Sequence, residues 1–127
     1  MKKGTKKKTD VVKPNEFRYN KARGGHPAYI VKVIQSSQPL QTPPKKKARF
    51  IGLTESPETQ GISNVPLDVN PNPDKRGKIK AYARPNVDEV VLTEKTFSKK
   101  LNGWEFDLND KEKIRVIIVN DSKKTKK

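Results

Sequence analysis

Residues 26–34 read HPAYIVKVI, and this near-continuous apolar run predicts a β-strand that is covered on both faces. A second apolar run, ARFIGLT, occupies residues 48–54. His26 opens the first run and Thr54 closes the second, so an imidazole and a hydroxyl lie at strand ends. Functional sites are often built at such positions. We therefore take His26 and Thr54 as the first candidate functional residues.

Short strands and proline-rich connections are expected around these two runs. Residues 35–47 hold three prolines and a lysine triplet, and they predict a long exposed hairpin loop with a basic tip. Further short strands are expected at residues 17–19, 62–69, 79–83 and 87–92. The last two are either separate strands or one strand bent at Pro85. The chain is therefore expected to be mainly β.

The C-terminal part of the chain has a different pattern. Asn109, with Glu112 three residues later, resembles a capping box and predicts a helix through about Val119. The β-branched run at residues 114–119 favours a strand instead, so both remain open. Trp104 is expected to anchor the core rather than to stack on a base. Several short strands with one terminal helix describe a small β-barrel or rolled sheet.

Composition limits the size of the core. Of the 127 residues, 31% are hydrophobic and 34% are charged, which favours one domain with a modest core. Both ends are rich in lysine, and we expect residues 1–13 and 121–127 to be disordered basic tails. The single domain is then expected at residues 14–120. The formal net charge is +15, of which +8 falls on residues 11–120.

This positive charge favours a polyanionic partner. Nucleic acid is the first expectation, through phosphate neutralisation and counterion release. An acidic protein or an anionic membrane surface is the alternative. The side chains expected to contact phosphates are Lys45, Lys46, Lys47, Lys75, Arg76, Lys78, Lys80 and Arg84. No apolar run approaches the roughly 20 residues of a membrane-spanning helix, and the N-terminus lacks the apolar core of a secretion signal, so a cytoplasmic protein is expected.

Residue counts exclude several functional classes. The chain has no cysteine, which excludes disulfides, thiol catalysis and cysteine-ligated zinc. One histidine argues against a zinc or non-haem iron site, so we expect neither a metal nor a cofactor. Gly77 and Lys78 are followed by Ile79, where a phosphate-binding loop needs Ser or Thr. Nucleotide hydrolysis of that type is therefore excluded.

The order of these motifs resembles the MazF/PemK family of endoribonuclease toxins. The shared pattern is a His-Pro strand start at residues 26–31, a strand ending in Thr54, a β segment at 87–92 and a C-terminal helix. It spans about residues 24–119. The resemblance implies a small SH3-like barrel that usually dimerises, cuts single-stranded RNA without a metal and is held by an acidic antitoxin. His26 stands where the family has arginine, and the family's N-terminal Gly-Asp-Ile signature is absent.

Metal-free RNA cleavage needs a base for the 2′-hydroxyl proton, an acid for the leaving oxygen and cations for the charge at phosphorus. His26 can serve as acid or base, because imidazole exchanges protons near neutral pH. Arg23 and Arg49 can stabilise charge, and Thr54 can hydrogen-bond a phosphate. The structural alternatives are a turn role for His26 and a strand-end role for Thr54.

Two functions remain open from the sequence. The first is an RNA-binding barrel with endoribonuclease activity. The second is a non-catalytic accessory protein of a phage or mobile element that binds nucleic acid or inhibits a host nucleic-acid enzyme. The chain also resembles uncharacterised small basic proteins of bacterial mobile elements. The His-for-Arg change favours the second function, whereas the strand-end chemistry favours the first, and we expect RNA rather than DNA in both.

Overall fold

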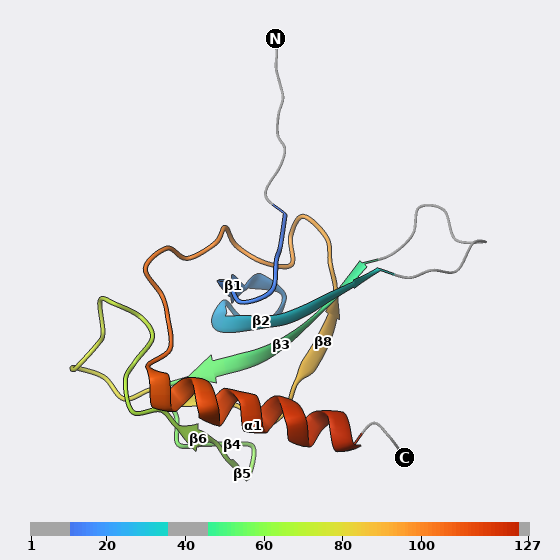
Figure 1. Ribbon diagram of the computed structural model, residues 1–127. Coiled ribbons are helices and arrows are strands. Elements are labelled where there is room, and N and C mark those ends of the chain that lie inside the picture. Colours follow the sequence, from blue (N-terminus) through green and yellow to red (C-terminus); the bar gives the residue numbers. More distant parts are fainter. Residues whose placement is uncertain (1–10, 36–45, 125–127) are drawn as a thin grey trace.

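Two long antiparallel strands, β2 and β3, form the centre of the computed structural model, which describes residues 11–35 and 46–124 (Figure 1). The elements in chain order are β1 (Phe17–Asn20), the 3-10 helix η2 (Lys21–Arg23), β2 (His26–Gln35), β3 (Lys46–Thr54), β4 (Glu58–Thr59), β5 (Ile62–Ser63), β6 (Val65–Pro66), β7 (Tyr82–Ala83), β8 (Asp88–Val91) and α1 (Leu108–Lys124). The mainly β expectation with one C-terminal helix is confirmed.

Strand β3 is the central strand of the main sheet. β2 pairs along one edge of β3, with a bulge between Ile30 and Lys32. The other edge is divided, because β8 pairs with residues 47–50 and β7 pairs with residues 53–54. β1 lies beyond β2, and β6 lies beyond β7. Within the described residues these outer strands do not pair with each other, so the expected closed barrel is corrected to an open sheet.

Apolar side chains from β2 and β3 enter two separate hydrophobic clusters. Successive residues of a strand point to opposite faces, so one strand can supply both clusters. The first cluster includes Phe17, Ile51, Leu53, Leu67, Ala83, Phe106, Ile114 and Ile117. The second consists of Ala28, Ile30, Ala48, Phe50 and Phe97, with Val33 packed against it. The prediction that the strand at residues 26–34 is covered on both sides is therefore confirmed.

The C-terminal segment is a helix, which confirms the helical alternative over the strand. Ile114, Ile117 and Ile118 recur at helical spacing and contact the first cluster. The capping residue differs from the prediction. The carboxylate of Asp107 accepts a hydrogen bond from the backbone amide of Asn109 at 3.2 Å, so Asn109 already lies inside the helix. The helix also continues to Lys124, so residues 121–124 are helical rather than part of a tail.

A buried carboxylate ties α1 to the segment after β6. Asp110 has no exposed surface, and its Oδ1 and Oδ2 accept hydrogen bonds from the backbone amides of Asp68 (2.7 Å) and Val69 (3.0 Å). Lys113 lies 3.5 Å from the same carboxylate. A carboxylate removed from water needs such donors. Asp110 therefore fixes the helix against the strand-poor segment that leads to β7.

The shorter strands agree only in part with those predicted from the sequence. Residues 62–69 pair at β5 and β6 only, and the strand expected at 79–83 is reduced to β7. β8 is separate from β7, so Pro85 divides two strands. Lys46 and Lys47 open β3 rather than lying in the loop. Lys45 lies outside the described residues, as do the remainder of that loop and the tail residues 1–10 and 125–127.

Candidate functional site

A pocket of about 460 Å³ lies where β2 begins and β3 ends. Ala28 pairs with Gly52, so the antiparallel register carries the start of β2 to the end of β3. His26 and Thr54 both line this cavity, which we call the large pocket. Its lining residues are Tyr19, Gly25, His26, Pro27, Leu53, Thr54, Glu55, Ser56, Asn70, Pro71, Asn72, Lys75, Ala81 and Trp104. The structure therefore brings the two strand-end candidates together.

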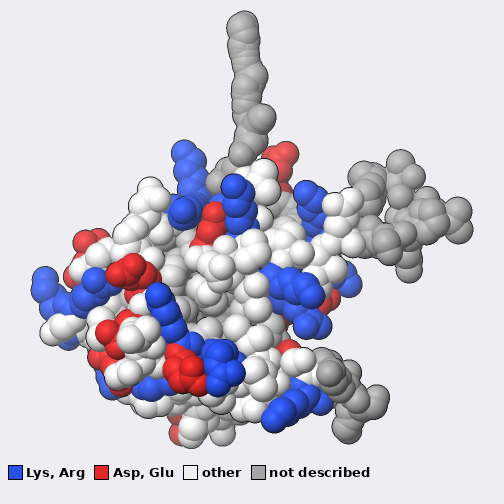
Figure 2. Space-filling view, viewed as in Figure 1, with Lys and Arg blue, Asp and Glu red and all other residues white. Residues whose placement is uncertain are grey.

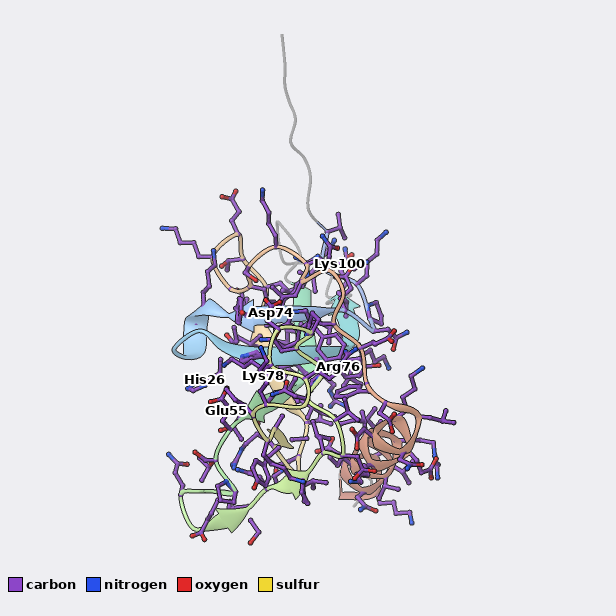
Figure 3. All side chains as sticks on the ribbon, turned by 90° about the vertical axis from the view of Figure 1, so that its left-hand side faces the viewer. His26, Glu55, Asp74, Arg76, Lys78 and Lys100 are labelled. Atoms are coloured by element: carbon purple, nitrogen blue, oxygen red, sulfur yellow. The ribbon has the colours of Figure 1, made fainter. Side chains whose placement is uncertain are left out.

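A glycine pair presents His26 at the rim of the large pocket. Gly24 and Gly25 have φ values of 81° and 78°, a left-handed conformation that glycine adopts at low cost. The amide of Gly25 donates to the carbonyl of Asn20 at 2.8 Å, which closes the turn between β1 and β2. His26 follows this turn and is exposed. Figure 3 shows its side chain beside Glu55.

An ion pair joins the end of β3 to the loop before β7. Glu55 follows Thr54 directly, and its carboxylate accepts a hydrogen bond from Lys75 Nζ. This bond raises the pKa of Lys75, so the ammonium stays charged. The Thr54 hydroxyl accepts a hydrogen bond from the amide of Ser56 at 3.1 Å, which is the expected strand-end role. Its own hydrogen remains able to donate to a ligand.

Side chains of the Asn-Pro-Asn-Pro-Asp motif shape the loop that carries Lys75. Asn70 is buried, and its side-chain NH₂ group donates a hydrogen bond to the carbonyl of Ile79 at 2.9 Å. Its Oδ1 accepts a hydrogen bond from the backbone amide of Asn72. Asn72 in turn accepts from the amide of Asp74 at 2.9 Å. The guanidinium of Arg76 donates to the carbonyls of residues 70 and 71, at 3.4 Å each. Arg76 therefore hydrogen-bonds within the loop and does not line the large pocket.

Two aromatic rings line the large pocket. Trp104 lies with its ring centroid 5.7 Å from that of Phe17 and 6.1 Å from that of Tyr19. Trp104 is half-buried, so the expected core contact is present, and it also lines the pocket. Tyr19 is 37% exposed. The sequence analysis missed Tyr19 and Glu55, although Glu55 could have been found because it follows Thr54 at the same strand end.

The structure does not bring every sequence candidate to this site. Arg49 lies in the middle of β3, does not line the large pocket and donates to Glu89 at 3.3 Å. That hydrogen bond is the main cause of the lowered pKa of Glu89. Arg23 belongs to η2 beside the glycine turn, but its side chain lies outside the described part.

The two groups of basic residues expected to contact phosphates, those at 46–47 and those at 75–80, lie toward opposite ends of β3. Lys46 and Lys47 open the strand, and Lys47 lies 3.4 Å from Glu89. At roughly 3.3 Å per residue, Lys47 is about 23 Å along the strand from Thr54. Lys78 and Lys80 are exposed in the loop before β7, and Figure 3 places Lys78 and Arg76 on the same side of the molecule as His26. Arg84 lines a second, smaller pocket.

On the face drawn in Figure 2, basic and acidic side chains are mixed. Figure 2 shows lysine and arginine side chains interspersed with acidic ones over the visible side of the described residues. Across residues 11–35 and 46–124 no group of three or more His, Cys, Asp or Glu residues is placed to hold a metal ion. No helix within the same ranges is long and apolar enough to cross a membrane.

Comparison with known proteins places this chain in no family. No family model matches it, and no curated protein or solved structure matches it either.

Proposed function

We propose that this protein binds single-stranded RNA, and that the large pocket receives an unpaired base together with its phosphate. The observation that carries the proposal is the composition of that pocket. It combines the rings of Tyr19 and Trp104 with the ammonium of Lys75 and with two hydrogen-bonding groups, His26 and Thr54. Aromatic stacking contributes about 1–3 kcal/mol per base and tolerates any sequence. The net charge of +15 adds attraction for phosphates.

The pocket favours RNA over the other polyanionic partners. A flat anionic membrane needs a broad basic face, whereas acids and bases alternate over the visible surface in Figure 2. A volume of about 460 Å³ lies in the usual range of small-molecule pockets, about 300–1,000 Å³. Unpaired bases of single strands can enter such a pocket, while those of a duplex are stacked inside the helix.

Metal-free cleavage of the bound RNA is the second candidate function, because His26 and Glu55 line the same pocket. One of the two would take the 2′-hydroxyl proton while the 2′-oxygen bonds to phosphorus. The bond to the 5′-oxygen would break, and the other group would protonate that leaving oxygen. Lys75 lies beside Glu55 and would offset the charge at phosphorus. The products would be a 2′,3′-cyclic phosphate and a 5′-hydroxyl.

The resemblance to the MazF/PemK family suggests the biological role in which such cleavage would occur. It would make the protein a cytoplasmic, homodimeric endoribonuclease toxin with an SH3-like core and an acidic antitoxin as partner. The open sheet and the C-terminal helix support a mainly β domain with one terminal helix, which is the general architecture of that fold without its closed barrel. In the alternative, the protein is a non-catalytic accessory protein of a phage or mobile element that binds RNA through the same pocket.

Binding is tested with a short 2′-O-methyl RNA, which cannot be cleaved through its 2′-oxygen. Replacing Tyr19 by Leu removes a ring of the large pocket, and the dissociation constant should rise about tenfold. Tyr82→Leu is the matched control, because Tyr82 is half-buried in β7 and lines neither pocket. Fluorescence anisotropy measures both. Equal losses for the two variants, or no binding by the parent protein, would contradict the proposal.

Cleavage is tested with unmodified RNA in the presence of a chelator. His26→Ala should abolish cleavage, because it removes a proton-transfer group, and should weaken binding only by the loss of one hydrogen bond. Thr54→Val should slow the reaction less, since it removes a hydrogen bond rather than a proton carrier. Cleavage that survives His26→Ala rules out the mechanism. A parent protein that binds but does not cut RNA supports the accessory role.

A further inference from the structure

A second cavity adjoins the large pocket. It has a volume of about 180 Å³, and we call it the small pocket. The two cavities share His26, Pro27, Leu53 and Thr54 in their linings. The small pocket lies below the usual range of about 300–1,000 Å³ for independent ligand sites. It therefore suits one group of a ligand that also occupies the large pocket.

A buried amide faces the small pocket without a partner for its donors. Asn20 is 2% exposed and lines this cavity. Its Oδ1 accepts a hydrogen bond from the amide of Ala22 at 3.1 Å, whereas its NH₂ group has no hydrogen-bond acceptor among the described residues. A buried donor left unpaired costs roughly 1–3 kcal/mol. A ligand acceptor in the small pocket would satisfy it.

Two further donors are held in place by one asparagine. Asn64 is 6% exposed; its Oδ1 accepts from Arg84 Nη1 at 2.6 Å, and its amide donates to Thr59 Oγ1 at 2.9 Å. The backbone amide of Arg84 also donates to Gly52 at 2.8 Å. Arg84 and Thr59 both line the small pocket. The remaining guanidinium N–H groups and the Thr59 hydroxyl are thus positioned to donate to a ligand.

The small pocket also contains one carboxylate, that of Asp88 in β8. Asp88 is half-buried and forms no ion pair or side-chain hydrogen bond within the described ranges. A bare phosphate would be repelled by this carboxylate, and a cation would be repelled by Arg84. The cavity therefore fits a neutral group that accepts hydrogen bonds at several atoms and donates one.

We propose that the small pocket is a uracil subsite beside the RNA-binding pocket. The Watson–Crick edge of uracil presents an acceptor, a donor and an acceptor, namely O2, N3–H and O4. Asp88 would accept from N3–H, and donors from Asn20 and Arg84 would reach the two carbonyl oxygens. Cytosine and adenine each place an NH₂ donor where uracil has a carbonyl. The single-ring base also suits the smaller volume.

This inference rests on the proposed RNA binding and specifies which nucleotide enters each pocket. A dinucleotide would place uracil in the small pocket and its neighbouring base against the exposed part of the aromatic rings in the large pocket. The linking phosphate would then lie at the shared wall, beside His26 and Thr54. That is the position where a cleavable phosphate would meet the strand-end groups. The small pocket thereby predicts selectivity at one nucleotide and tolerance at the next.

The test compares 2′-O-methyl dinucleotides that pair adenosine with each of the four bases, in both orders. Those with uridine should bind the parent protein about tenfold more tightly than those with cytidine. Asp88→Asn should reduce this preference, because the amide can also donate to N3 of cytosine. Glu94→Gln removes the same charge at an exposed site outside both pockets and should leave the preference unchanged. A loss of folding would weaken binding of every dinucleotide instead of changing the ratio between uridine and cytidine.

A second measurement follows the side-chain amide of Asn20 by NMR. Its resonances should shift on addition of the uridine dinucleotide and stay in place with adenosine monophosphate. RNA binding with no base preference, or a preference that Asp88→Asn leaves intact, would overturn the uracil subsite alone. Failure of the parent protein to bind any RNA would overturn the proposed function as well.

Discussion

Lys75 Nζ donates a hydrogen bond to the carboxylate of Glu55, and both side chains line the large pocket. The bond links the loop before β7 to the end of β3. A phosphate bound in the large pocket would therefore compete with Glu55 for the lysine. The hydrogen bond raises the pKa of Lys75, which favours its charged form.

Removing this competitor should strengthen RNA binding. Glu55→Gln is expected to lower the dissociation constant for 2′-O-methyl RNA a few-fold, because Lys75 becomes free to contact a phosphate. Lys75→Ala should weaken binding, and the double variant should match Lys75→Ala. The anisotropy measurements form a double-mutant cycle. If Glu55 acts in proton transfer, Glu55→Gln also loses cleavage while it gains affinity. Additive effects of the two changes would show that the pair does not act through phosphate binding.

Salt dependence should identify the basic loop that meets the RNA. Lys78 and Lys80 lie in the loop that carries Lys75, whereas Lys46 and Lys47 lie at the other end of β3. For single strands the log–log salt slope changes by about 0.7 per neutralised phosphate. Replacing Lys78 and Lys80 by Ala should therefore flatten the slope by up to about 1.4. The matched Lys46/Lys47 pair should change it less, and a larger effect there would move the interface to that end.

Asp110 should be one of the most sensitive positions for stability. Asp110→Ala leaves the backbone amides of Asp68 and Val69 without the acceptors they have in the folded protein. Hydrogen bonds to charged groups contribute about 1.5–3 kcal/mol each, so a loss of about 3 kcal/mol is expected in urea unfolding. Asp110→Asn keeps one acceptor oxygen and should recover part of the loss. Leu108→Ala serves as control, because Leu108 is 79% exposed at the start of the same helix.

Stability should fall in acid because three carboxyl groups have lowered pKa values in the folded protein. The pKa of Asp68 is lowered mainly by a hydrogen bond from Lys113, that of Glu89 mainly by one from Arg49, and that of Glu112 mainly by one from Arg115. The unfolded values are about 4 to 4.5, so this stabilisation is complete above pH ~5 and is lost as pH falls through the folded values. Thermal unfolding at several pH values measures the effect. Glu89→Gln should flatten the acid limb, whereas Glu94→Gln should leave it unchanged.

The sequence alone determined the elements that depend on local pattern. The apolar runs at residues 26–34 and 48–54 predicted two strands, because their spacing is a property of the chain itself. An antiparallel hairpin between them also accounts for the meeting of His26 and Thr54 at one end. The helix was expected from the capping-box pattern of Asn109 and Glu112, with a strand as the alternative, although its cap proved to be Asp107 rather than Asn109.

Only the tertiary structure decided what depends on contacts between distant residues. β3 divides its second edge between β7 and β8, which leaves the sheet open, and no local pattern encodes that division. The approach of Lys75 to Glu55 and the half-burial of Trp104 likewise follow from packing across the fold. Arg49 was a reasonable candidate by residue type, yet the pairing of β3 with β8 places it against Glu89. Strand pairing is chosen by long-range burial, and so the composition of each pocket emerges only once the strands are assembled.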